Sequence, residues 1–246
     1  MSHPPYLAIV GRPKPTGIRN RLIRSLSVDD LALLQPHLEV VHLERGDVMI
    51  EPNQPIRYVY FPEDSIGSIV ATVSDYRRIE VGIFGRDGMS GTSLLLGANT
   101  SPHETFIQVP GSALRMEADA LRHTIRQSPS LHEHLLRYIE AFQVQVAYTA
   151  LSHGSFTIEE RLARWLLMCH DRLDGTDLPL VHEFLSLMLG VRRSGVTIAV
   201  QTLEGTGAIK GTRGHIIIRD RKMLEEAANG GYGVPEAVYF SLFPEP

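Results

Sequence analysis

The feature that most constrains the fold is a change of periodicity near residue 117. Before it, between Leu38 and Met116, short β-rich runs alternate with turn signals such as ERGD, EPNQP, PEDS, GRDG and GANTSP. The runs are VVHL, VMI, YVYF, SIVATV, IEVGIF, ETFIQV and ALRM. Many short strands at near-regular spacing are typical of an antiparallel sandwich or a barrel-like roll. After residue 117 the pattern becomes helical, so the sequence predicts an α+β chain in which an antiparallel β-roll precedes a helical part.

The first long helix of that part is expected from about Ser130 to Ser152, roughly 34 Å at 1.5 Å per residue. One face of it repeats at alternating steps of four and three residues, and Ile139 and Val146 widen this stripe. Core packing is the usual reason for such a stripe. Because the helix leaves a compact β-domain to reach the next domain, we expect instead that it pairs with a second copy. The predicted dimer seam is Leu131, Leu135, Tyr138, Phe142, Gln145 and Thr149.

A second domain follows, and its order of elements is distinctive. Thr157-Ile-Glu-Glu160 is a capping box that starts a helix, in which each residue of the pair satisfies an exposed amide of the other. Two shorter helical segments, at 181–189 and 192–204, flank Gly190, and β-like runs at Ile209 and 215–218 flank the turn GTRG. Helix, tight turn, helix and hairpin are the order of a winged helix-turn-helix.

The charge of this segment differs from that of the rest of the chain. From Gly190 to Lys222 there are seven basic residues against Glu204 and Asp220, a net of +5, although the whole chain carries −4. A basic run alone is often only a solvated face, but here it coincides with the predicted second helix, whose N-terminal residues would meet base edges in the major groove. The predicted DNA-binding residues are Arg192, Arg193, Ser194, Thr197 and Gln201 at the bases, with His182, Lys210 and Arg213 at flanking phosphates.

The stretch LPLVHEFLSLMLGVRRSGVTIAVQTLEGTGAIKGTRGHIIIRD resembles the DNA-binding domain of the Crp/Fnr family of bacterial transcription regulators. ERGDVMIEPNQPIRYVYFPEDSIGSIV resembles the opening strands of the same family's sensor, a cyclic-nucleotide-binding-like β-roll, and the resemblance spans roughly Leu26 to Asp220. It implies a sequence-specific regulator that binds double-stranded DNA as a homodimer on an inverted repeat, with Arg193 as the chief base contact. Where relatives often carry a glutamate and a second arginine, this chain has Ser194 and Ile198.

The resemblance also divides the chain into expected segments. They are a flexible N-terminal arm (1–24), a β-roll sensor domain (25–128), a long dimerisation helix (129–153), a winged helix-turn-helix DNA-binding domain (154–226) and a C-terminal tail (227–246). Regulation in this family resembles a population shift, in which an effector in the β-roll alters how the helices pair. Whether the chain activates or represses, and whether it contacts RNA polymerase, the sequence leaves open.

The effector region departs from the pattern of relatives that bind cAMP. In those relatives a Gly-Glu pair and a downstream Arg-Ser or Arg-Thr hold the ribose and the cyclic phosphate. Here Thr92 follows Gly91 in place of the glutamate, and His103-Glu104-Thr105 stands where the arginine is expected. Because the carboxylate of Glu104 would repel a phosphate, we expect neither cAMP nor cGMP to bind. The sequence does not identify another effector. The pocket expected to hold one is formed by Gly91, Thr92, Ser93, His103 and Thr105.

Other classes of protein find little support. The single Cys169 excludes an internal disulfide and an iron–sulfur cluster held by cysteines, none of the 11 histidines has a setting diagnostic of haem, and no metal or other cofactor is predicted. A cupin-like metal-dependent enzyme would need clustered ligands, but His132 and His134 point apart on a helix, so we expect no enzyme. A module that binds a protein through its winged domain is the other alternative. With no signal peptide and no apolar run of about 20 residues, a cytoplasmic protein without membrane contact is expected.

Overall fold

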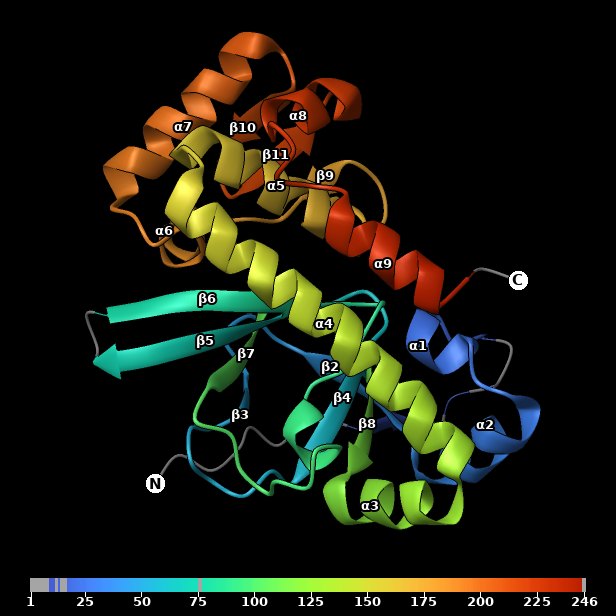
Figure 1. Cartoon of the computed structure of the whole chain (residues 1–246). Coiled ribbons are helices and arrows are strands. Elements are labelled where there is room, and N and C mark those ends of the chain that lie inside the picture. The colour runs from blue at the N-terminus through green and yellow to red at the C-terminus, as the bar shows by residue number, and fades with distance from the viewer. Residues whose placement is uncertain (1–8, 12, 14–16, 75–76, 245–246) are drawn as a thin grey trace.

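The computed structural model describes residues 9–11, 13, 17–74 and 77–244, without the side chains of Ile9, Val10, His182 and Glu183. A long helix, α4 (Pro129–Ser155), organises the molecule, as Figure 1 shows. The β-roll and the helices that precede α4 in the chain lie along its lower part, and a mainly helical domain caps its upper end. The order of a β-roll, a long helix and a winged helix-turn-helix agrees with the sequence prediction, and the fold is α+β.

The β-roll consists of two four-stranded antiparallel sheets in the described part of the chain. Their strand orders are β1-β2-β8-β4 and β3-β7-β5-β6. All seven predicted β-rich runs are strands, and β1, which pairs with β2, precedes them. The strands are β1 (Ile9–Gly11), β2 (Glu39–Leu43), β3 (Val48–Ile50), β4 (Tyr58–Pro62), β5 (Ile66–Ser74), β6 (Arg77–Phe84), β7 (Glu104–Val109) and β8 (Gly111–Glu117).

Short helices close the ends of the roll. Ser27 caps α2 (Val28–Leu34), because its hydroxyl oxygen accepts a hydrogen bond from the Asp30 amide at 3.1 Å. The 3-10 turns η2 (Gln35–His37) and η3 (Thr92–Leu94) and the helix α3 (Ala118–Gln127) complete this part.

The N-terminal segment is only partly the loose arm that the sequence suggests. Within it, α1 (Arg21–Arg24) is anchored to the roll, and Leu22 and Ile23 are fully buried. The side-chain amide of Asn20 donates hydrogen bonds to the carbonyl oxygens of Pro62 and Gly88 at 2.8 and 2.9 Å. Most of the earlier residues of the predicted arm lie outside the described part. The expectation of a flexible 1–24 arm is therefore wrong for residues 20–24, because two apolar side chains and a buried amide fix them.

The upper domain has the elements of a winged helix-turn-helix and one strand that the sequence reasoning missed. Its capping box is present: the Thr157 amide donates to Glu160 Oε2 at 2.8 Å, and the Glu160 amide donates to Thr157 Oγ1 at 3.3 Å. Strand β9, only two residues long, joins the hairpin to give a sheet of order β10-β11-β9. The elements are α5 (Ile158–His170), β9 (Asp177–Leu178), α6 (His182–Leu189), α7 (Arg193–Thr206), β10 (Ile209–Thr212), β11 (His215–Ile218) and α8 (Arg221–Ala227).

The segment predicted as a C-terminal tail contains a helix that returns to the sensor. Helix α9 (Val234–Leu242) lies alongside α4 and ends near α1 in Figure 1. Tyr239 and Phe243 belong to the core of the β-roll domain, and the ring of Phe243 meets His134 of α4 edge-on at 5.1 Å. Residues 227–246 are thus no simple tail, because α9 buries two aromatic side chains against the other domain.

The predicted seam of α4 faces its own chain. Five of its six residues are buried and Phe142 is half-buried, and the covering elements are the β-roll, including β6, and α9. The approach is close: a Cβ added at Gly82 of β6 would lie 2.7 Å from Phe142 Cζ. Assigning Leu131, Leu135, Tyr138, Phe142, Gln145 and Thr149 to a dimer contact is therefore wrong. The exposed residues of α4 lie mainly on its opposite side, and they include Glu133, Leu136, Arg137, Glu140, Gln143, Ala147, Ala150, Leu151 and Gly154.

Candidate nucleic-acid interface

A tight turn sets the angle between α6 and α7. Helix α6 ends at Gly190, whose φ of 61° and ψ of 35° are left-handed, a conformation that costs other residues energy. The Val191 amide then donates to the Ser186 carbonyl oxygen at 3.0 Å, which closes the helix end. A Cβ at Gly190 would also lie 3.1 Å from Ile79 Cδ1 of β6, so this turn fits tightly against the β-roll.

Helix α7 separates an apolar face from a polar one. Val196, Ala199, Val200 and Leu203 are buried against the rest of the domain. The predicted base-contacting residues on the other side are all exposed, and they are Arg192, Arg193, Ser194, Thr197 and Gln201. Ile198 and Thr202 are exposed on the same side. The amphipathic pattern therefore orients α7 so that its first two turns present arginine, hydroxyl and amide groups outward.

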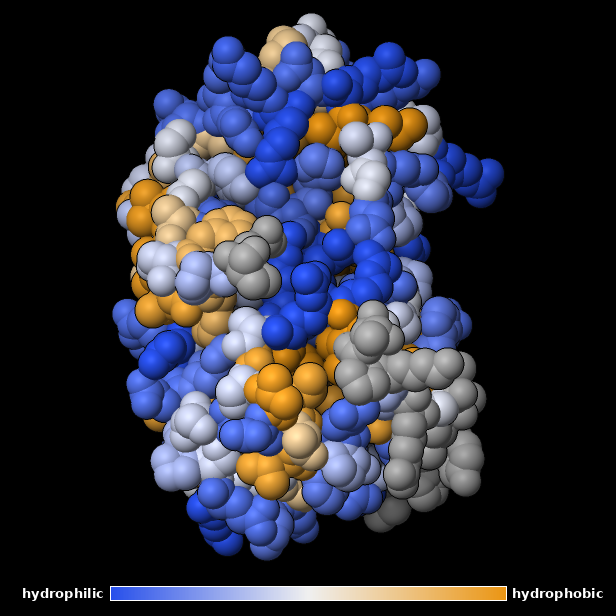
Figure 2. Space-filling model, turned by 90° about the vertical axis from the view of Figure 1, so that its right-hand side faces the viewer, coloured by the Kyte–Doolittle hydropathy of each residue, from blue (hydrophilic) through white to orange (hydrophobic). Residues whose placement is uncertain are grey.

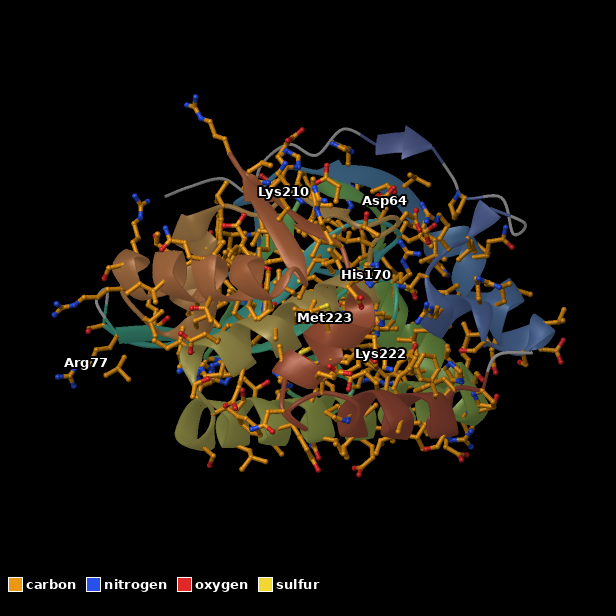
Figure 3. The ribbon with its side chains drawn as sticks, turned by 90° about the horizontal axis from the view of Figure 1, so that it is seen from above. Asp64, Arg77, His170, Lys210, Lys222 and Met223 are labelled. Carbon is orange, nitrogen blue, oxygen red and sulfur yellow. The ribbon has the colours of Figure 1, made fainter. Side chains whose placement is uncertain are left out.

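The wing lies beside this helix and is tied to it by a hydrogen bond. The Gly211 amide of β10 donates to Glu204 Oε1 at 2.8 Å, so the carboxylate near the end of α7 fixes the start of the hairpin. His215 Nδ1 lies 2.9 Å from Asp177 Oδ1, which links β11 to β9. Lys210 and Arg213 are exposed on the hairpin, and Figure 3 places Lys210 on the wing, apart from Lys222 and Met223 of α8.

The remaining predicted contact, His182, opens α6, but its side chain lies outside the described part of the chain. In Figure 2 the winged domain occupies the top of the view, and its surface there is mainly hydrophilic. Apart from His182, the structure brings the predicted DNA-binding residues to α7 and the adjacent wing. It adds Ile198 to their surface, a residue that sequence reasoning noted only as a departure from relatives.

The contact between the domains includes a buried carboxylate that the sequence reasoning did not single out. Glu80 of β6 accepts hydrogen bonds from Trp165 Nε1 of α5 at 2.8 Å and from Ser68 Oγ at 2.6 Å. Burial raises the pKa of Glu80 to about 8, although these hydrogen bonds and the nearby Arg164 and Arg172 favour the charged form. A glutamate inside the apolar run IEVGIF was the available signal.

Ion pairs surround this contact. Arg172, just after α5, is buried and donates from Nε and Nη2 to the two oxygens of Asp87, at 3.0 and 2.5 Å. The pKa of the Arg172 guanidinium is raised even though burial alone would lower it, because Asp87 and other carboxylates lie close. Arg86 Nε in turn donates to the Arg172 carbonyl oxygen at 2.7 Å. The upper domain is thus joined to the β-roll domain by buried polar contacts as well as by apolar packing.

The predicted effector residues lie in different elements. Gly91 has a φ of 73° and precedes the 3-10 turn that contains Thr92 and Ser93. A Cβ added at Gly91 would lie 2.8 Å from Val59 Cγ1. Thr105 is buried on β7, and His103 borders a surface hollow with Arg77 and Arg78. Glu104 forms a close ion pair with Arg78 of β6, so the carboxylate in the expected phosphate position already has a cationic partner.

A larger cavity lies between the second sheet and the turn before α7. Its volume is about 640 Å³, and the rings of Phe106 and Phe184 on its wall lie 5.8 Å apart. The Arg78–Glu104 pair and Arg192 contribute the charged part of the wall. In the described residues we find no group of three or more His, Cys, Asp or Glu placed to hold a metal ion, and no helix long and apolar enough to cross a membrane.

Known proteins resemble this chain both in its helix-turn-helix domain and over most of its length. Residues 160–227 match the Crp-like helix-turn-helix domain. A CRP-like cAMP-activated global transcriptional regulator of Mycobacterium tuberculosis is 25% identical over 220 residues, which covers 85% of this chain and 97% of that protein.

Two solved structures share the fold at lower identity. A CRP-family transcriptional regulator of Thermus thermophilus superposes with a TM-score of 0.64 at 17% identity, covering 77% of this chain and 96% of its own. The c-di-GMP responsive global regulator CLP of Xanthomonas campestris gives a TM-score of 0.62 at 15% identity, covering 78% and 99%. The matched domain and the relative from M. tuberculosis support the class of a Crp/Fnr-type transcription regulator, and the two solved structures share its fold.

Proposed function

We propose that the protein is a homodimer that binds an inverted-repeat operator and places α7 of each copy in successive major grooves. The observation that carries this proposal is the exposed polar face of the first turns of α7, opposite a buried apolar face and beside an exposed wing. In such dimers the half-site centres lie one helical turn apart, about 34 Å or 10 bp, or a multiple of that.

The dimer contact that fits this chain is the outer face of α4. Leu136, Glu140, Gln143, Ala147 and Leu151 are exposed there, at successive steps of four, three, four and four residues, close to the spacing that pairs helices. Ala147→Glu should therefore convert the dimer to a monomer in sedimentation velocity, because it places a charge at the centre of the seam. Ala237→Glu, the same change on exposed α9, should leave the dimer intact. A dimer that survives Ala147→Glu would refute this seam.

The base contacts follow from the position of each side chain on α7. Arg193 makes the principal base contact, Arg192 contacts a base or a phosphate, and Ser194, Thr197 and Gln201 adjust specificity. Arg193→Ala should lose about 1–3 kcal/mol of binding free energy and relax base preference at one position in each half-site. Full affinity with unchanged preference in a binding-site selection would refute the assignment.

The phosphate contacts require a different measurement. Lys210 and Arg213 of the wing, with His182 at the start of α6, anchor the domain to the flanking backbone. Lys210→Ala should weaken binding to all sequences about equally and reduce the slope of log affinity against log salt by about 1 for each half-site. If the slope of the variant equals that of the unmodified protein, Lys210 contacts no phosphate.

The sensor does not use cAMP or cGMP as its effector. Thr92 stands in place of the glutamate that would hold the ribose, and His103-Glu104-Thr105 stands in the sequence where the arginine for the cyclic phosphate is expected. Relatives with this fold respond to different molecules, since one is described as cAMP-activated and another as c-di-GMP responsive. Isothermal calorimetry with cAMP and cGMP should give no binding heat. Micromolar binding that also tightens operator affinity would refute this part of the proposal.

A further inference from the structure

An exposed isoleucine occupies the centre of the outward face of α7. The side chain of Ile198 is 58% exposed, whereas Val196, Ala199 and Val200 beside it in the sequence are buried. Residues three and four positions apart share a helix face, so Ser194 and Gln201 are its neighbours along the axis. A single exposed apolar residue is ordinary on a protein surface, and exposure alone assigns Ile198 no role.

The side chains around Ile198 leave it accessible to a partner. Ser194 is short, and a Cβ added at Gly205, two turns further along the same row, would meet no atom within 4 Å. Two neighbouring hydroxyls already donate to carbonyl oxygens of the helix: Thr197 Oγ1 to Arg193 at 3.1 Å, and Thr202 Oγ1 to Ile198 at 3.0 Å. Ile198 is therefore an exposed apolar group that lies beside the short Ser194, the locally bonded Thr197 and Thr202, and the longer Gln201, on the surface that also carries Arg193.

Only one group on the base edges of the major groove is apolar, the 5-methyl of thymine. Every other position offers a hydrogen-bond donor or acceptor, which an isoleucine cannot satisfy and would desolvate. We propose that Ile198 determines operator specificity by packing against the 5-methyl group of one pyrimidine in each half-site. This inference rests on the proposed operator binding, and it assigns a base-reading role to a position where relatives often carry an arginine.

The expected effect follows from the free energy of burying one methyl-sized group. That free energy corresponds to about a fourfold change in affinity for one half-site, and about 15-fold for two half-sites that contribute independently. Thymine and 5-methylcytosine present the same methyl group, whereas uracil and cytosine lack it. The measured contrast is thus a methylated base against its unmethylated form at one position, with all Watson–Crick hydrogen bonds retained.

The experiment starts from an operator selected with the full-length unmodified protein. Each thymine of the half-site is replaced in turn by deoxyuridine in both half-sites, and affinities are measured for the unmodified protein and for Ile198→Ala. At one position the unmodified protein should lose about 15-fold with deoxyuridine, and Ile198→Ala should bind both forms equally. Placing a 5-methylcytosine·guanine pair at that position should restore the preference over cytosine·guanine in the unmodified protein only.

Controls separate this inference from the proposed function. Gln201→Ala, a change on the same face, should alter affinity but keep the difference between thymine and uracil. If no inverted repeat is selected, or if Arg193→Ala binds the selected DNA at full strength, operator binding through α7 itself is wrong. If the operator is bound but no thymine position responds to deoxyuridine, or if Ile198→Ala responds equally, operator binding stands and the assignment of Ile198 is wrong.

Discussion

The buried carboxylate between the two domains leads to a quantitative prediction about stability and pH. Burial raises the pKa of Glu80 from 4.5 to about 8, so the folded protein keeps a proton there that the unfolded chain releases above pH 4.5. The free energy of unfolding must therefore fall as the pH rises from 4.5 to about 8, at up to about 1.4 kcal/mol per pH unit. Replacement by glutamine mimics the protonated carboxyl and should remove this dependence.

The comparison with Glu80→Gln separates the effect of Glu80 from that of the buried histidines. Burial lowers the pKa of His153 to about 4, and burial also lowers those of His134 and His170. These groups act with the opposite sign, since stability increases with pH through their range and this increase ends only above the ordinary histidine value of 6.5. Because both proteins share the histidines, the unmodified protein should lose about 2 kcal/mol more than Glu80→Gln between pH 6.5 and 8.

The only tryptophan of the chain provides the assay, because Trp165 donates its indole hydrogen bond to Glu80. Urea unfolding followed by tryptophan fluorescence, at pH 6.5 and at pH 8, gives the free energy of unfolding in each case. Glu226→Gln removes the same charge from an exposed position and controls for the change in net charge. Equal losses of stability in the unmodified protein and in Glu80→Gln would refute the reasoning.

Three further changes test the packing. Gly190→Ala should cost about 1–2 kcal/mol of stability, because alanine is strained at this left-handed position. A lower thermal midpoint is expected, and an unchanged midpoint would contradict the turn geometry. Phe243→Ala should cost about 3 kcal/mol in urea unfolding, because it empties a buried site, whereas Phe240→Ala, at a 45% exposed position, should cost well under half of that. Thr157→Ala should cost about 1 kcal/mol by removing the capping box, and no loss would exclude its contribution.

The parts that the sequence predicts correctly are those set by local chemistry. The β-rich runs and the helices of the second domain could be located because alternation, turn residues and caps act within a few positions. The capping box at Thr157 and the glycine that ends α6 are such local signals. The two-residue strand β9 has too little pattern of its own, and its pairing with β11 arises from the hairpin beside it.

The errors come from tertiary contacts. The stripe on α4 correctly indicates a buried face, but periodicity does not say whether the same chain or a partner covers it. The covering helix α9 lies about 90 residues further along the chain, in the segment that was expected to be a tail. Glu80 shows the same limit, since its partner Trp165 is 85 residues away. The exposed side of α7 was predictable, whereas the chemistry of Ile198 becomes informative only once its neighbours are placed.

The return of α9 to the sensor changes the mechanics of the molecule. The DNA-binding domain is attached to the sensor twice, once where α4 leads into α5 and again where α8 leads to α9 (Figure 1). A domain on a single connection is restrained by its packing and one covalent link, whereas this domain is restrained by its packing and two. Any displacement of α7 relative to the β-roll must therefore be accommodated both between α4 and α5 and between α8 and α9.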